Sequence, residues 1–145
     1  MPNPIPEGYH SVTPYLTVTD VAKLIDFVTS AFGATERGKL AGPDGRIAHA
    51  EMLIGDSIVM MGQPQNESDA RRSMLYLYVP DVDATYNRCL AAGATSVREP
   101  KDQFYGDRNS AVRDPLGNDW YIATHIEDVS MEEMERRMSA QRASA

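Results

Sequence analysis

His49 and Glu51 form a carboxylate–imidazole pair two positions apart in an apolar segment of the sequence. Alternate residues of a strand point to the same face, so a strand over 47–54 places both side chains together. If that face lines a cleft, Glu51 acts as a general base and His49 adjusts its pKa. The structural alternative is a hydrogen-bonded polar pair on a sheet surface. Tyr121 and Arg108 complete the candidate catalytic set.

Arg108 follows a glycine and an aspartate in the segment 106–108 (GDR). Its guanidinium can hold the carboxylate of a ligand through paired hydrogen bonds. The alternative is a salt bridge within the protein, for example with Asp107 or Asp114. Phe104 and Tyr105 lie on a predicted loop just before it, where they form a lid over the cleft or pack on a partner subunit.

An internal repeat in the sequence predicts the helices and strands that position these residues. Residues 16–21 (LTVTDV) return at 77–82 (LYVPDV), and 33–35 (GAT) return at 93–95. A repeat of about sixty residues implies two copies of one supersecondary unit. Each copy must bury its apolar face, so a cleft where the two units meet is the expected place of function.

Both copies are predicted to have the order β-α-β-β-β. In the first, a strand over 11–18 with Pro14 at a sheet edge precedes a helix that begins after Asp20 and ends at Gly33. Strands over 35–40, 47–54 and 57–61 follow. In the second, a strand over 74–79 and a helix that begins after Asp81 and ends at Gly93 precede strands over 95–98, 107–113 and 120–125.

Alternation along the two first strands predicts the lining of the cleft. Val12, Pro14, Leu16 and Val18 face the first helix, and Leu75, Leu77 and Val79 face the second. The cleft then receives Thr13, Tyr15 and Thr17 from one unit and Met74, Tyr76 and Tyr78 from the other. Tyrosine and methionine suit a planar or partly aromatic organic molecule. The alternative is that the tyrosines fill the cleft and bond to one another.

The paired units, each with V-x-D before its helix, resemble the vicinal oxygen chelate superfamily of glyoxalases, bleomycin-resistance proteins and extradiol dioxygenases. Several short motifs resemble its PhnB-like branch: 9–16 (YHSVTPYL), 49–51 (HAE), 54–57 (IGDS), 105–108 (YGDR), 114–118 (DPLGN), 123–125 (ATH) and the helix 130–137. The resemblance implies an α+β fold in which two βαβββ units form a curved, mixed-sheet funnel, followed by a C-terminal helix. It also implies a homodimer. We expect one domain over 1–145, with units at 11–63 and 74–125 and the helix at 130–141.

The resemblance also places the superfamily's metal ligands on this sequence, at Thr13 and Met74 in the first strands and at Met60 and Tyr121 in the last. Divalent cations are normally held by imidazole, carboxylate or thiolate donors. We therefore expect no metal and no other cofactor. The predicted ligand-binding residues are Thr13, Tyr15, Met60, Met74, Tyr76, Tyr78, Tyr105, Arg108 and Tyr121.

Composition narrows the possible partners. The net charge of -7 disfavours nucleic acid, which needs a basic footprint. The single cysteine, Cys89, lies on the apolar side of a predicted helix and suits a reducing cytoplasm. We expect neither a signal peptide nor a membrane span. In the last predicted helix, Met131, Met134 and Met138 form a stripe that packs on the body, on a second subunit or on varied partners.

We therefore expect a cytoplasmic homodimer that binds a small organic molecule without a metal. The alternative is a lyase, isomerase or dioxygenase-like enzyme of the same superfamily that uses Glu51 and His49, with or without a divalent metal. A third hypothesis is a regulatory module whose funnel is sealed by its own tyrosines. The sequence does not name the ligand.

Overall fold

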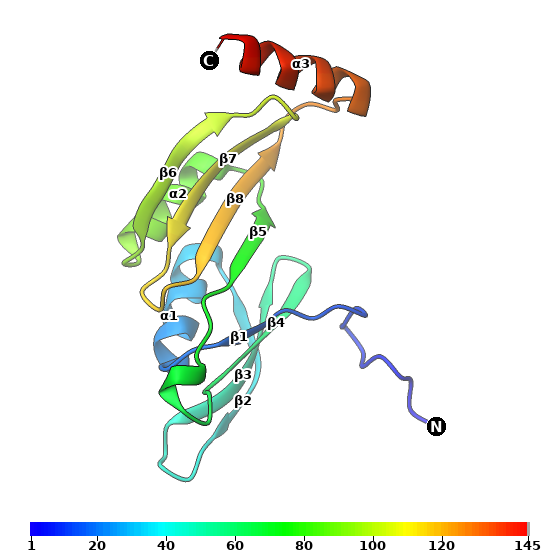
Figure 1. The fold of residues 1–145 in the computed structure, drawn as a ribbon. Helices are drawn as coiled ribbons and strands as arrows, with labels where there is room; N and C mark the ends of the chain where they lie inside the picture. The colour runs from blue at the N-terminus through cyan, green and yellow to red at the C-terminus, as the bar shows by residue number, and fades with distance from the viewer. Residues whose placement is uncertain (145) are drawn as a thin grey trace.

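The computed structural model describes residues 1–144 and contains two four-stranded sheets, each covered by one helix (Figure 1). Unit one comprises β1 (Tyr15–Thr17), α1 (Val21–Phe32), β2 (Thr35–Ala41), β3 (Ile47–Ile54) and β4 (Ser57–Gly62). Unit two comprises β5 (Met74–Tyr78), α2 (Val82–Ala91), β6 (Thr95–Asp102), β7 (Asp107–Arg113) and β8 (Asp119–His125). A short 3-10 turn (Glu67–Asp69) connects the units, and α3 (Met131–Ser144) ends the chain.

The two sheets share one topology, which confirms the α+β fold of paired βαβββ units with a C-terminal helix. Their strand orders are β1-β4-β3-β2 and β5-β8-β7-β6. In each, the first strand runs parallel to the last, and the other neighbours are antiparallel. Consequently β1 and β5 are both edge strands, and each is followed directly by its helix.

Local signals explain why the helices begin and end where they do. The Asp20 carboxylate accepts a hydrogen bond from the Lys23 N–H, and the Asp81 carboxylate accepts one from the Ala84 N–H. Gly33, with φ of 66°, takes the left-handed conformation that closes α1. These caps are the aspartates and glycine that the repeat predicted.

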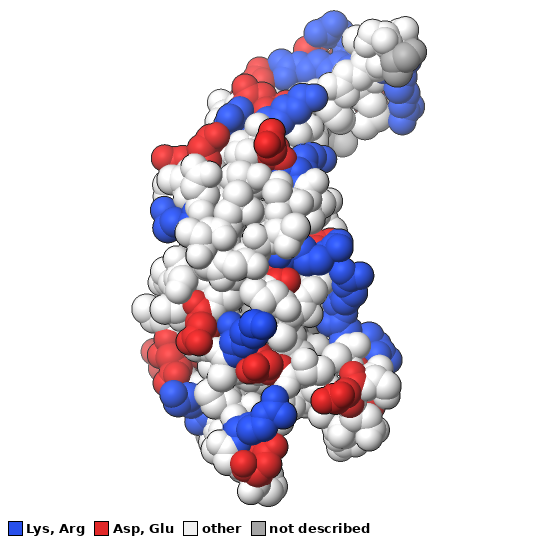
Figure 2. Space-filling model, turned by 90° about the vertical axis from the view of Figure 1, so that its left-hand side faces the viewer, with Lys and Arg blue, Asp and Glu red and all other residues white. Residues whose placement is uncertain are grey.

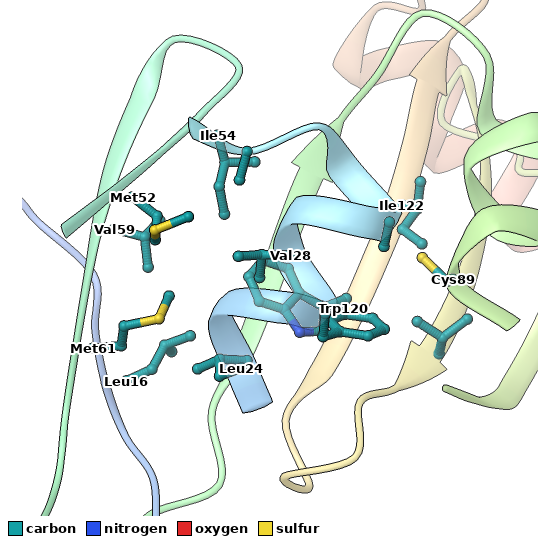
Figure 3. Packing of buried hydrophobic residues seen from close by; sticks show 14 of the residues in the cluster. Leu16, Leu24, Val28, Met52, Ile54, Val59, Met61, Cys89, Trp120 and Ile122 are labelled. Carbon is teal, nitrogen blue, oxygen red and sulfur yellow. The ribbon is translucent and has the colours of Figure 1, made fainter. Parts of the chain in front are cut away.

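The core joins the two units through their helices. Leu24 and Val28 of α1, Cys89 of α2 and Trp120 and Ile122 of β8 belong to one buried cluster (Figure 3). Burial raises the pKa of the Cys89 thiol to about 12, so this cysteine is an inert part of the core. The helices therefore hold the units together, and the sheet faces turned away from the helices remain for function.

Two structural predictions are wrong. The first strand begins at Tyr15, and Val12 lies 85% exposed outside the sheet, because Pro14 has no N–H to continue the ladder. Leu90, which the helical spacing places with Cys89 on the apolar side of α2, is on the partly exposed side of that helix.

Met131 and Met138 of α3 are exposed, so packing on the body is the one of their three alternatives that the structure does not show. Helix α3 lies at one end of the molecule (Figure 1), held there by the Arg137 guanidinium on Glu127 and on the Phe104 carbonyl.

The surface gives no sign of a basic docking face on the side seen in Figure 2. Lys and Arg side chains there are mixed with Asp and Glu over the lower half and at the upper tip, several of them gather along the right-hand edge, and the upper body between is largely uncharged. Among residues 1–144, no helix is both long and apolar enough to cross a membrane.

Candidate functional site

The open face of the second sheet gathers aromatic and polar side chains from three strands. Tyr76 lies opposite Tyr121, and Asp107 lies opposite His125. Along β8, Trp120 and Ile122 alternate with Tyr121 and point toward α2 and the core. The four side chains named above therefore lie on the opposite face of the sheet, away from the helix. We call the set Tyr76, Tyr78, Asp107, Asn109, Tyr121 and His125 the tyrosine face.

Asp107 is the centre of the tyrosine face and is only 3% exposed. Its Oδ2 accepts hydrogen bonds from the Tyr76 and Tyr78 hydroxyls, both at 2.8 Å. Its Oδ1 lies 2.9 Å from His125 Nδ1, and His125 Nε2 lies 2.7 Å from an Asp128 carboxylate oxygen. A buried carboxylate thus fixes two tyrosines and one imidazole.

The pKa values of these groups follow from the same contacts. Burial by itself raises the pKa of the Asp107 carboxyl, but the hydrogen bonds from His125, Tyr76 and Tyr78 outweigh it, so that the pKa lies below its usual value. The hydrogen bonds to Asp107 and Asp128 raise the pKa of His125. For Tyr78 the hydrogen bond to Asp107 is the main cause of a raised pKa. Both tyrosines are therefore neutral hydrogen-bond donors at neutral pH.

Asn109 extends the network toward the β6–β7 turn. Its Nδ2 donates to the Tyr76 hydroxyl at 3.0 Å and to the Tyr105 hydroxyl at 2.6 Å. Its Oδ1 accepts from the Arg98 guanidinium at 2.9 Å and from Gln103 Nε2 at 3.2 Å. Tyr105 is therefore fixed to the tyrosine face by Asn109, at the tip of a tight hairpin.

Tyr121 packs between two planar groups on this face. Its ring stacks on Tyr76 with centroids 6.2 Å apart and planes 13° apart. The Arg98 guanidinium carbon lies 5.3 Å from the centre of the Tyr121 ring. Both contacts are made by the ring of Tyr121, so this residue contributes an aromatic surface to the tyrosine face.

The open face of the first sheet carries the His49–Glu51 pair. The Tyr15 hydroxyl lies 3.3 Å from His49 Nδ1, and His49 Nε2 lies 3.8 Å from a Glu51 carboxylate oxygen. Met60 of β4 is the direct neighbour of both Tyr15 and Glu51 across the sheet. The structure thus brings together a Tyr–His–Glu row, but Tyr121 and Arg108 lie in the other unit.

An N-terminal arm, residues 6–10, covers part of this first face. Gly8 lies against Ile58 of β4: a methyl group added at Gly8 would be 3.4 Å from the Ile58 side chain. The Arg37 guanidinium lies 5.6 Å from the centre of the Tyr9 ring. The Tyr9 hydroxyl is buried, and burial and the Glu51 carboxylate raise its pKa. Sequence reasoning missed Tyr9, because the arm has no periodic pattern that assigns it to a face.

Arg108 does not join either face. Its guanidinium contacts Asp83 of α2 at 2.8 Å and Asp102 at 3.1 Å, on the helix side of the second sheet. The expected ligand cation is therefore an internal ion pair, although with partners other than Asp107 and Asp114. Thr13 also stands apart, because it precedes β1 and its hydroxyl lies 3.4 Å from the His10 carbonyl.

A groove lies between the two units beside the tyrosine face. It has a volume of about 390 Å³ and is lined by the β3–β4 turn, residues 54–57, and by residues 76–78 of β5. A smaller cavity of about 120 Å³ continues it and adds Pro14, Val59, Leu75 and Trp120. The larger space has a volume within the range of pockets that bind small organic molecules, and the smaller one does not. We call the larger space the inter-unit groove.

The side chains at the superfamily's metal positions do not fit a divalent cation. Thr13 is outside the sheet, Met60 and Met74 offer thioethers, and Tyr121 is stacked through its ring. Within residues 1–144 no group of three or more His, Cys, Asp or Glu is arranged to hold a metal ion. No step of chemistry is therefore assigned to a metal here.

Two packed βαβββ units with open sheet faces define a glyoxalase-type protein. A family model described as the Glyoxalase/Bleomycin resistance protein/Dioxygenase superfamily matches residues 8–122, and the chain belongs to this superfamily. A protein of Mycobacterium bovis described as uncharacterized is 37% identical over 142 residues, covering 90% of this chain and 93% of the relative.

Solved structures agree with this assignment. TioX from Micromonospora sp. ML1 is similar with a TM-score of 0.68 and 29% identity, covering 81% of this chain and 99% of that one. A glyoxalase-related enzyme from Fulvimarina pelagi has a TM-score of 0.63 at 20% identity, covering 79% and 87%. The second likeness concerns the fold alone.

Proposed function

We propose that this protein binds a small organic molecule at the tyrosine face and the inter-unit groove, without a metal. The observation that carries the proposal is the buried Asp107 carboxylate, which fixes the Tyr76 and Tyr78 hydroxyls while these residues stay 40% and 59% exposed. Rigid, amphipathic rings beside a groove are a common way to hold a planar ligand. A network built only for stability would have no reason to keep its rings in solvent.

A thermal-shift screen of aromatic small molecules in the presence of EDTA tests the proposal. A ligand that binds only the folded protein raises Tm, and the shift must persist without divalent metal. Tyr76→Leu should abolish the shift, whereas Tyr15→Leu, the matched change in unit one, should leave it. A shift that requires an added metal would contradict metal-independent binding.

The proposal also includes the branch of the superfamily and the cellular compartment. We place the chain in the PhnB-like branch, because its short motifs occur in that order and spacing. We propose that it acts in the reducing cytoplasm, consistent with one buried cysteine.

A homodimer is supported by large apolar side chains left exposed, among them Met74 and Met131. Analytical ultracentrifugation should show a dimer for the full chain, and a monomer would contradict it. A chain ending at Val129 then tests whether α3 belongs to the interface, which it does only if the dimer weakens.

An enzymatic function remains a second candidate because of the Tyr15–His49–Glu51 row. A hydroxyl, an imidazole and a carboxylate in sequence can move a proton in a lyase or isomerase reaction. Thermal shifts with Ni²⁺, Zn²⁺, Mn²⁺ and Fe²⁺ separate its versions. A metal-induced shift that Glu51→Ala abolishes favours a metalloenzyme, and the absence of any shift leaves metal-free chemistry or binding alone.

A further inference from the structure

We propose that the inter-unit groove selects an organic cation, an amine or amidine carried on an aromatic or apolar body. This inference rests on the proposed function and adds the charge of the ligand. The following observations concern residues 1–144, and each bears on the charge that the groove accepts.

The first observation is the charge of the lining. Asp56, in the β3–β4 turn, is the one charged residue among those that line the inter-unit groove, and the lining contains no Lys or Arg. Its carboxylate accepts a hydrogen bond from the Ser57 hydroxyl and pairs with no cation in the described part of the chain. A positively charged ligand would therefore meet a carboxylate at the groove, and an anionic one would be repelled.

The second observation is the direction of the tyrosine hydroxyls. Both Tyr76 and Tyr78 donate their protons inward to Asp107 Oδ2, and the Tyr76 oxygen also accepts from Asn109 Nδ2, so the ring faces are the part left for a ligand. The two ring centroids lie 5.3 Å apart with planes 59° apart, so the rings form two walls of an electron-rich corner. Aromatic faces attract cations.

The third observation is the carboxylate behind those rings. Asp107 and Asp128 both contact the His125 imidazole, and the Arg98 guanidinium bonds to Asn109 of the same network. The Tyr76 and Tyr78 hydroxyls donate to the Asp107 carboxylate, which makes their rings more electron-rich. An ammonium or amidinium is the ligand group that such rings favour.

Two arginines lie near the groove, and both are held by hydrogen bonds to uncharged groups of the protein. Arg98 donates to Asn109 and covers Tyr121. Arg88 lines an adjoining cavity that shares Ile54, Gly55, Leu77 and Tyr78 with the groove, and it donates to the Ala31 carbonyl and to the Thr85 hydroxyl. Neither guanidinium is among the residues that line the groove itself.

Three soluble probes of similar shape and different charge test the inference: benzamidine as its cation, benzamide and benzoate. Their binding is followed by NMR titration of the backbone amides of residues 54–57 and 76–78. Benzamidinium should bind about tenfold more tightly than benzamide, and benzoate should bind more weakly than either. Equal or tighter binding of benzamide or benzoate at these residues overturns the cation preference and leaves the proposed function standing. If none of the three binds and the aromatic screen also finds no ligand, both proposals fall.

Two variants locate the preference in the groove. Asp56→Asn removes the exposed carboxylate, and it should weaken benzamidinium about threefold without changing benzamide. Asp44→Asn is the matched control, because it removes an acid of the β2–β3 turn that does not line the groove. An equal effect of the two variants would attribute the preference to net charge and overturn the inference. Tyr78→Leu should weaken benzamidinium more than benzamide, because it removes one of the two aromatic faces, and unchanged benzamidinium binding in that variant would also overturn the inference.

Discussion

The two units of this chain share a backbone and differ in the chemistry of their open faces. Tyr15 and Tyr76 are equivalent, because each comes one residue before the repeated segments 16–21 and 77–82 and pairs with the last strand of its own sheet. His49 of β3 and Asn109 of β7 occupy corresponding positions in the strand registers of the two sheets. At this position unit one has an imidazole beside its tyrosine and unit two has an amide, and Tyr76 of unit two bonds in addition to the Asp107 carboxylate. The helix sides kept their apolar pattern, and the open faces diverged.

The units also differ in how far their open faces are covered. The N-terminal arm lies over unit one at Ile58 and Arg37, so that Ile58 is only 4% exposed. Tyr76 and Tyr78 of unit two keep their rings in solvent. Tyr15 of unit one nevertheless stays 50% exposed, so the arm shields the Ile58 end of that face and leaves its tyrosine open. The two units therefore differ in which part of the open face is covered, and the following changes test that difference.

Asp107→Ala should have the largest effect. It removes the acceptor of three hydrogen bonds in a buried position, and we expect a loss of about 3 kcal/mol in the free energy of unfolding. Urea denaturation measures the loss. Asp128→Ala is the matched control, because Asp128 bonds the same imidazole from a fully exposed position and should change stability little. Similar losses in the two variants would mean that Asp107 does not organise unit two.

Tyr76→Phe and Tyr15→Phe compare equivalent tyrosines directly. The Tyr76 hydroxyl donates to Asp107 and accepts from Asn109, so its removal should cost about 1 kcal/mol. The Tyr15 hydroxyl has only a 3.3 Å contact with His49 on an exposed side chain, and its removal should be close to neutral. Equal costs would contradict the difference between the two faces.

The sequence predicted the fold well because the fold depends on features that repeat. The V-x-D segments gave both helix starts through Asp20 and Asp81, and alternation placed Tyr76 and Tyr78 on one face. These signals are local, since a cap or a strand face involves residues close in the chain. They required no knowledge of which strands pair.

The centre of the site was not predictable in the same way. Both sides of β7 are mixed in polarity, Asp107 and Asn109 on one and Arg108 and Ser110 on the other, so alternation alone cannot tell which side faces the helix. Pairing with β8 decides it, because Ser110 lies opposite Ile122 of the core. Arg108 was therefore assigned to the cleft and Asp107 was overlooked as its centre.

The pH dependence of His125 gives a smaller effect. Folding raises its pKa through Asp107 first and Asp128 second, so the stabilisation is complete below the unfolded pKa and is lost as pH rises through the folded pKa. NMR titration of the imidazole measures this pKa. Asp128→Asn should lower it only part of the way toward the ordinary value, because Asp107 remains. No change in that variant would show that Asp128 does not contact His125 in solution.

Removal of the arm should have the smallest effect on stability and the most selective one on dynamics. Deleting residues 1–10 uncovers Ile58 and Glu51 but leaves the tyrosine face untouched, since the arm contacts Arg37 and β4 and no residue of unit two among its described contacts. Hydrogen exchange should therefore accelerate at the amides of β3 and β4 and stay unchanged in β7 and β8. Equal acceleration in both sheets would show that the arm stabilises the whole molecule, and the difference in coverage would then not separate the two units.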